Sequence, residues 1–103
     1  MIEAPNRTFA EGLATGAAFQ LTQSILWEKL HDFILASEEE ILQAMVWMIE
    51  HAHTLAEAAG AAALAAVYRR RLNLKGKKVG IICSGGNTSI EQLERSFAFV
   101  RSQ

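Results

Sequence analysis

A polar turn with two glycines directly follows the most strand-like segment of the sequence. Val79–Cys83 is an unbroken apolar run, and Ser84–Asn87 (SGGN) separates it from a helical pattern that starts near Ile90. Free amides at a helix N-terminus attract anions, and glycines allow a backbone to approach a ligand closely. Open α/β sheets bind ligands where a buried strand passes into a helix. The turn is therefore a candidate anion site, with a purely structural tight turn as the alternative.

Other side chains that could do chemistry have simpler interpretations. Glu50, His51 and His53 are close in sequence, but residues 51 and 53 lie about 200° apart on a helix and cannot share a metal ion. We therefore predict no metal site. Cys83 ends an apolar run, so we expect a packed, unreactive cysteine rather than a nucleophile. Methionines and tryptophans at helical spacing are expected to pack in the core: Met45, Met48, Trp27 and Trp47.

The composition limits the classes of protein to which the chain can belong. Its 103 residues are 50% hydrophobic and 20% charged, which suits one globular domain. Ten Lys and Arg against eleven Asp and Glu leave a net charge of -1, so no basic field attracts nucleic acid or anionic lipid. The single cysteine cannot form an internal disulfide, and no secretory-signal or membrane-spanning pattern is present. We expect a cytoplasmic protein that binds neither nucleic acid nor membrane.

The spacing of apolar residues predicts alternating helices and strands. Residues 1–8 have the pattern of a loop or ragged end, and residues 9–103 that of a single α/β half-domain. The predicted elements, in order, are a helix over 19–30, a short strand over 31–36, a helix from 37, a helix over 55–68, a buried strand over 79–83 and a helix over 90–100. This order predicts a partial three-layer α/β unit without internal repeats.

Capping signals define several helix ends. Ser37 with Glu40 three residues later matches a capping box. The helix that follows has apolar residues on two sides, which predicts that it lies between other elements. Arg69–Arg71 suits the negative end of an alanine-rich helix and is expected to be solvated. Thr88 or Ser89 can cap the last helix.

Four segments together resemble one family of enzymes. They are TFAEGLAT at 8–15, ASEEEI at 36–41, EAAGAAALAA at 57–66 and KGKKVGIICSGGN at 75–87. In order and spacing they are similar to the C-terminal part of the pyridoxal-phosphate-dependent threonine dehydratases, a fold-type II group that includes serine dehydratase and serine racemase. Those enzymes are considerably longer. The resemblance therefore implies a fragment of the fold-type II large domain.

The resemblance implies that four residues bind the cofactor. Ser84 matches the serine that hydrogen-bonds the pyridine nitrogen of pyridoxal phosphate, and Gly85 follows it in the same turn. Gly12 matches a glycine whose backbone lies beside the cofactor ring, and Glu57 matches an acidic residue near the cofactor. This replaces the anion-site interpretation, because the family holds the phosphate in a separate glycine-rich loop. A serine hydroxyl is barely acidic, which implies a largely unprotonated ring and a weaker electron sink.

Two parts that the resemblance requires do not occur in the 103 residues. The family's cofactor-binding lysine lies in a Ser-Phe-Lys motif, and the phosphate loop is rich in glycine. The lysines of this sequence have contexts typical of a helix surface or a polar turn: Lys29, Lys75, Lys77 and Lys78. We therefore predict that the chain holds no catalytic residue and has no lyase activity by itself.

Two hypotheses about function remain. In the first, the chain is the C-terminal segment of a threonine or serine dehydratase-like lyase and supplies one wall of the pyridoxal-phosphate site. The intact family converts threonine to 2-oxobutanoate and ammonia, so the amino-acid substrate would bind only after an N-terminal fragment completes the site. In the second, the chain is a non-catalytic module derived from that fold, which self-associates or binds a partner. A two-stranded unit is marginal and exposes strand edges, which predicts a homo-oligomer.

Overall fold

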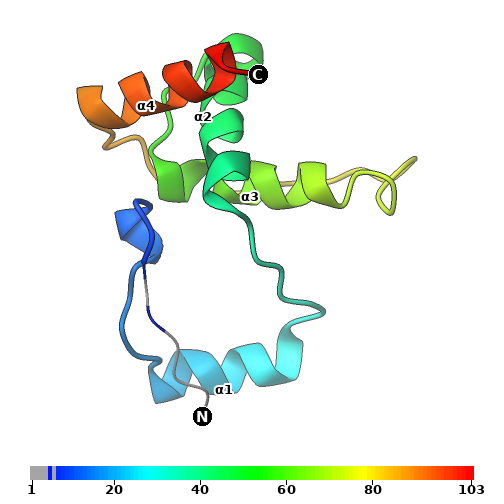
Figure 1. Cartoon of the computed structure of the whole chain (residues 1–103). Coiled ribbons are helices and arrows are strands. Elements are labelled where there is room, and N and C mark those ends of the chain that lie inside the picture. The colour runs from blue at the N-terminus through cyan, green and yellow to red at the C-terminus, as the bar shows by residue number, and fades with distance from the viewer. Residues whose placement is uncertain (1–4, 6) are drawn as a thin grey trace.

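The computed structural model describes residue 5 and residues 7–103. Most of the loop predicted over residues 1–8 therefore lies outside the described residues. The described part contains one short 3-10 helix and four α-helices (Figure 1): η1 (Glu11–Leu13), α1 (Gln20–Lys29), α2 (Glu38–Ala52), α3 (Ala58–Arg69) and α4 (Ile90–Arg101). All four predicted helices are confirmed, and their ends lie within a few residues of those expected.

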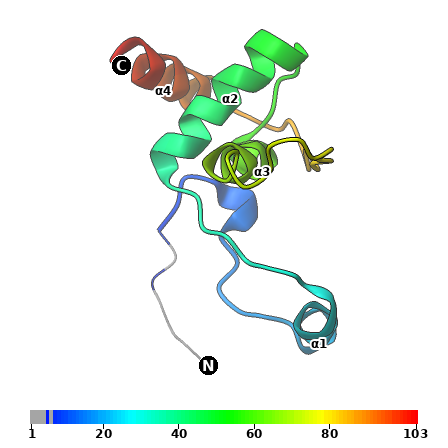
Figure 2. The ribbon, with the colours of Figure 1, turned by 90° about the vertical axis from the view of Figure 1, so that its right-hand side faces the viewer.

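Helix α2 is the central element of the packed region. It packs against α3 and α4, which confirms the prediction from its two apolar sides. Figures 1 and 2 show α3 and α4 each crossing α2, on opposite sides of it. The buried residues of α2 include both predicted methionines: Ile41, Leu42, Ala44, Met45, Val46 and Met48. Helix α3 contributes mainly alanines to the same core, and these small side chains let the two helices approach closely.

A buried polar contact joins α4 to α2. Ser96 is fully buried, and its hydroxyl lies 2.9 Å from the carbonyl oxygen of Gln92 and 3.3 Å from Sδ of Met45. The carbonyl satisfies the hydroxyl within its own helix, which removes the cost of burying an unpaired polar group. The small Ser96 side chain thus leaves space for the Met45 thioether at the α2–α4 contact.

Ser37 begins α2 through the predicted capping box. Its Oγ accepts a hydrogen bond from the Glu40 amide at 3.1 Å, and Oε1 of Glu40 accepts one from the Ser37 amide at 2.8 Å. The pKa of Glu40 lies below its ordinary value of 4.5, mainly because the Ser37 amide donates a hydrogen bond to its carboxylate. Partial burial opposes this effect, while the Ser37 hydroxyl and the Arg69 guanidinium add to it. Glu40 therefore stays ionised to lower pH in the folded chain.

We expect the capping box to lose its contribution in acid. Because the pKa of Glu40 is lower in the folded chain than in the unfolded chain, its contribution is present above pH 4.5 and disappears as the pH falls through the folded pKa. Ser37→Ala should lower the free energy of unfolding by about 1 kcal/mol at pH 7. Urea unfolding at pH 7 and at pH 3 measures both effects. Because Ser37→Ala keeps the Ser37 amide, Glu40→Gln tests the pH effect, and the account of the cap fails if Glu40→Gln costs as much at pH 3 as at pH 7.

The remaining helix ends and turns agree with the sequence patterns. Oγ of Ser89 accepts a hydrogen bond from the Gln92 amide at 3.2 Å and so begins α4. Arg69–Arg71 lies at the C-terminal end of α3 and is exposed, as predicted. Gly76, at the centre of the predicted polar turn, has φ +80°, a conformation that glycine adopts without strain.

Helix α1 stands apart from the packed region. Both views show it separated from α2, α3 and α4, at the end of two linkers. It has no buried residue, and its apolar side chains Leu21 and Trp27 are 74% and 80% exposed. The prediction that Trp27 lies in the core was therefore wrong. Helical spacing identified the helix, but no described element packs against it.

The two predicted strands are not confirmed, and neither is the three-layer α/β architecture. Residues 31–36 and 79–83 form neither helix nor strand, and the described part of the chain contains no strand. Ile82 is 81% exposed, and Cys83 is exposed rather than packed, which corrects the expectation for that cysteine. The physical reason is that apolar, β-branched runs become strands only when another strand pairs with them. These two segments do not pair with each other.

None of the described helices combines the length and the apolar character that crossing a membrane requires.

Candidate functional site

The Ser84–Asn87 turn lies against the N-terminal end of α3. The Glu57 amide donates a hydrogen bond to the carbonyl oxygen of Gly85 at 3.1 Å. Gly60, in the first turn of α3, approaches the same residue so closely that a Cβ at position 60 would overlap the Gly85 carbonyl oxygen. That Cβ would also lie 3.4 Å from Sγ of Cys83. Only glycine at position 60 permits this contact between helix and turn.

Glu57 lies between two glycine-containing segments. A Cβ at Gly85 would overlap Oε1 of Glu57, and a Cβ at Gly12 would lie 3.8 Å from Oε2 of Glu57 and 2.8 Å from Cβ of Ala59. Gly12 reaches this position because η1 packs against α3. The structure therefore brings together three of the four predicted cofactor-binding residues, Gly12, Glu57 and Gly85, from distant parts of the chain.

Ser84, the fourth predicted residue, precedes Gly85 in the turn and is exposed. Its hydroxyl makes no hydrogen bond within the described part of the chain. A hydroxyl can both donate and accept, so Ser84 can bind either a basic ring nitrogen or a donor. Glu57, when ionised, can only accept. The cluster therefore offers one adaptable hydroxyl and one carboxylate beside backbone that carries no side chain.

These groups fit one side of a flat, hydrogen-bonding ring such as that of pyridoxal phosphate. The free Ser84 hydroxyl suits the ring nitrogen, and Gly85 and Gly86 leave the adjoining surface without side chains. That cofactor also requires a lysine amine and a loop that binds its phosphate. The described residues of the cluster include no lysine and no such loop. All four lysines of the chain are exposed. No group of three or more His, Cys, Asp or Glu residues suited to a metal occurs among the described residues.

The sequence patterns missed Gly60, although they contained a signal for it. Alanine is preferred over glycine inside a helix by about 1 kcal/mol, so a lone glycine in an alanine-rich helix calls for an explanation. Gly60 is also buried. The segment EAAGAAALAA at 57–66 carries the family resemblance as a whole, and Gly60 was not singled out within it. The close approach of the SGGN turn is that explanation. Its partner, Gly85, was predicted as a cofactor-binding residue, and the structure adds a packing role.

Comparison with known proteins identifies the class to which this fold and site belong. Residues 2–85 match the family described as pyridoxal-phosphate dependent enzyme, and the chain belongs to this family. The matched region includes all four predicted site residues. This confirms the resemblance found in the sequence.

Particular members of the family are similar over most of this chain. L-threonine ammonia-lyase of Thermotoga maritima is 38% identical over 88 residues, which are 85% of this chain and 22% of that enzyme. Serine racemase of Schizosaccharomyces pombe is 34% identical over 86 residues, 84% of this chain and 27% of the relative. L-threonine dehydratase catabolic TdcB of Escherichia coli K12 is 33% identical over 95 residues, which are 90% of this chain and 29% of that enzyme. The chain thus spans about a quarter of the length of these relatives.

Proposed function

We propose that the chain supplies one wall of the pyridoxal-phosphate site in a threonine or serine dehydratase-like lyase. The observation that supports this most is the meeting of Gly12, Glu57 and the Ser84–Asn87 turn at one end of α3. Two of the similar enzymes are named for threonine breakdown, and a third is a serine racemase. We infer threonine as the substrate of the complete site, with 2-oxobutanoate and ammonia as products.

The residues of the wall have separate roles in this proposal. Ser84 hydrogen-bonds the ring nitrogen through its free hydroxyl, while Gly12 and Gly85 present backbone beside the ring. Glu57 accepts a hydrogen bond near the cofactor and also fixes the turn through its amide, which donates to Gly85. When bound, pyridoxal phosphate withdraws electrons from the α-carbon of the amino acid. Because serine cannot hold a protonated ring as a carboxylate would, we infer a modest electron sink suited to elimination.

The proposed site needs residues beyond these 103. The 103 residues contain neither the Ser-Phe-Lys motif nor a second glycine-rich loop. One face of α3 is also uncovered, and a cavity of about 490 Å³ lies between this face and the unpaired segment 33–36, with Ala62, Ala66 and Phe33 among its lining residues. We infer that an N-terminal fragment supplies the lysine and the phosphate loop and covers this surface.

Incubation of the purified chain with pyridoxal phosphate and threonine tests this proposal. We expect no ammonia release, because covalent attachment of the cofactor requires a lysine placed at the site. Borohydride reduction followed by mass spectrometry should give partial labelling spread over the exposed lysines Lys29, Lys75, Lys77 and Lys78. Stoichiometric labelling of one lysine together with threonine turnover would show that the chain is a complete enzyme and would contradict the proposal.

The second candidate function is self-association of a non-catalytic module. The exposed α1 favours it, since a helix with no buried residue and a largely exposed Trp27 has apolar surface that a second copy can cover. Light scattering of the same sample separates the two candidates. A dimer or larger assembly at micromolar concentration supports the module, whereas a stable monomer excludes it.

A further inference from the structure

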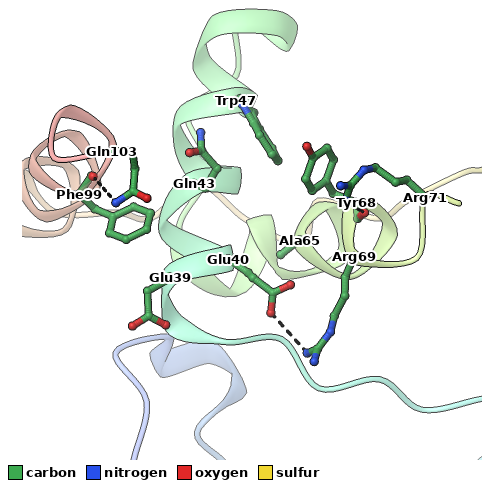
Figure 3. A pocket seen from close by; sticks show the side chains of 10 residues that line it. All are labelled: Glu39, Glu40, Gln43, Trp47, Ala65, Tyr68, Arg69, Arg71, Phe99 and Gln103. Carbon is green, nitrogen blue, oxygen red and sulfur yellow. Dashed lines mark hydrogen bonds and ion pairs between the residues drawn. The ribbon is translucent and has the colours of Figure 1, made fainter.

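A second cavity lies near the C-terminal end of α3 (Figure 3), whereas the SGGN turn contacts the N-terminal end of that helix. It has a volume of about 330 Å³ and is lined by residues of α2, α4 and the end of α3. We propose that this cavity binds a small organic cation, a primary ammonium group on an apolar body. The proposal is independent of the cofactor site, because the two sites are formed by opposite ends of α3 and share no residue.

Aromatic side chains form the apolar part of the cavity. Trp47 on α2 and Phe99 on α4 lie on either side of Gln43 (Figure 3). The ring of Tyr68 holds Trp47 in place, with ring centroids 4.4 Å apart and planes inclined by 59°. The faces of tryptophan and phenylalanine attract cations through the negative potential of their π-electrons. A cavity with two such rings therefore favours a positively charged guest over a neutral one.

The two arginines at the cavity are already occupied by the protein itself. Nη1 of Arg69 donates to the Leu35 carbonyl oxygen at 2.7 Å and to Oε1 of Glu40 at 3.4 Å. The guanidinium of Arg71 lies 4.0 Å from the centroid of the Tyr68 ring, and Nη1 donates to the Tyr68 carbonyl oxygen at 2.9 Å. The Glu40 carboxylate thus compensates the charge of Arg69, and the Arg71 guanidinium is held on Tyr68, on the side of the cavity away from Glu39 and Phe99 (Figure 3).

One carboxylate of the cavity remains uncompensated. Glu39 is exposed at the rim and has no ion pair or hydrogen bond with any described residue, whereas the Glu40 carboxylate is bound by Ser37 and Arg69. The side-chain amide of Gln43 is likewise unpartnered within the described part of the chain, and its oxygen can accept a hydrogen bond. An ammonium group has three donors and no acceptor, which matches these two groups. The volume is near the lower limit for ligand sites and suits a single-ring amine.

Benzylamine, which is protonated at pH 7, is the probe that tests the cavity. The background variant Trp27→Phe leaves Trp47 as the sole tryptophan, and residue 27 lies on the separate helix α1. Benzylamine should change the fluorescence of Trp47 in a saturable way. Benzyl alcohol, which has the same ring without the charge, should bind about fivefold more weakly, and benzoate should not bind.

Two variants assign the binding to the proposed groups. Glu39→Gln keeps the shape of the side chain and should weaken benzylamine binding about fivefold, with no effect on benzyl alcohol. Phe99→Leu keeps an apolar side chain but removes one ring, and it should weaken benzylamine more than benzyl alcohol. The matched control Glu28→Gln removes a carboxylate from α1 and should leave binding unchanged. Far-UV circular dichroism verifies that each variant is folded.

The same titration identifies the source of the ammonium group. Tighter binding of benzylamine than of Nα-acetyl-lysine methylamide indicates a free small amine as the natural ligand. The reverse order indicates a lysine side chain, and either order supports the site. The proposal is overturned if benzyl alcohol binds as tightly as benzylamine, if Glu39→Gln binds benzylamine as the parent does, or if neither amine binds.

Discussion

Gly60→Ala is expected to lower the free energy of unfolding by about 2 kcal/mol, although alanine is the better helix former. In an unhindered helix this replacement would stabilise the chain by about 1 kcal/mol. At position 60 the added Cβ would overlap the carbonyl oxygen of Gly85, and backbone cannot move aside as the end of a flexible side chain can. The SGGN turn must then leave the N-terminal end of α3, which breaks the hydrogen bond from the Glu57 amide to Gly85.

A matched glycine in the adjoining segment provides the control for this prediction. A Cβ at Gly80 has open space around it, and φ at this residue is not in the left-handed region. Gly80→Ala should therefore change the free energy of unfolding by less than about 0.5 kcal/mol. Urea unfolding followed by circular dichroism compares the two variants directly. Equal stability of Gly60→Ala and Gly80→Ala would show that the contact between α3 and the turn does not hold the site together.

The helices could be predicted from the sequence because their signals are local. Ser37 and Glu40 satisfy each other's amides at the start of α2 whatever surrounds them, and Ser89 accepts a hydrogen bond from the Gln92 amide at the start of α4. The apolar sides of α2 also predicted correctly that it lies between other helices. Helix α1 shows the limit of this reasoning. Its spacing predicted a helix, but burial of Trp27 depends on a neighbouring element that the described chain does not provide.

The two predicted strands were not confirmed for a related reason. Residues 79–83 have the composition of a buried strand, yet strand formation requires backbone partners on another segment. Ile82 is 81% exposed, as expected for an apolar residue in a strand-like segment that has no pairing partner. A strand-forming sequence without a strand is thus consistent with the short span of the chain relative to its curated relatives.

The candidate site was predictable only in part. Resemblance predicted Gly12, Glu57, Ser84 and Gly85, and the structure places Gly12, Glu57 and Gly85 near one another. Gly60 was missed: a lone glycine in an alanine-rich helix signals a constraint, but the approach of the turn that imposes the constraint is not visible in the local sequence. The cavity between Trp47 and Phe99 was also not predicted, since it is formed by three helices whose arrangement follows from packing.

Replacement of the matching segment in Thermotoga maritima L-threonine ammonia-lyase by this chain is expected to give a protein that binds pyridoxal phosphate and deaminates threonine. The two segments are 38% identical, so we expect the exchanged segment to fold in its new position. In the proposed arrangement, the remainder of that enzyme contributes the lysine and the phosphate loop, and this chain contributes the wall around Ser84. Threonine turnover should therefore be absent in the chain alone and present in the exchanged enzyme. This is the largest effect that we predict for the chain.

The most direct test of the central claim is the threonine turnover of this exchanged enzyme with Ser84→Ala. Loss of the hydrogen bond from the hydroxyl to the ring should lower turnover about tenfold or more. Ser24→Ala, which removes an exposed hydroxyl on α1, should leave turnover unchanged. Absorbance of the bound cofactor and circular dichroism report binding and folding in the same samples. A folded exchanged enzyme that binds no cofactor, or one in which Ser84→Ala and Ser24→Ala turn over threonine equally, would contradict the account.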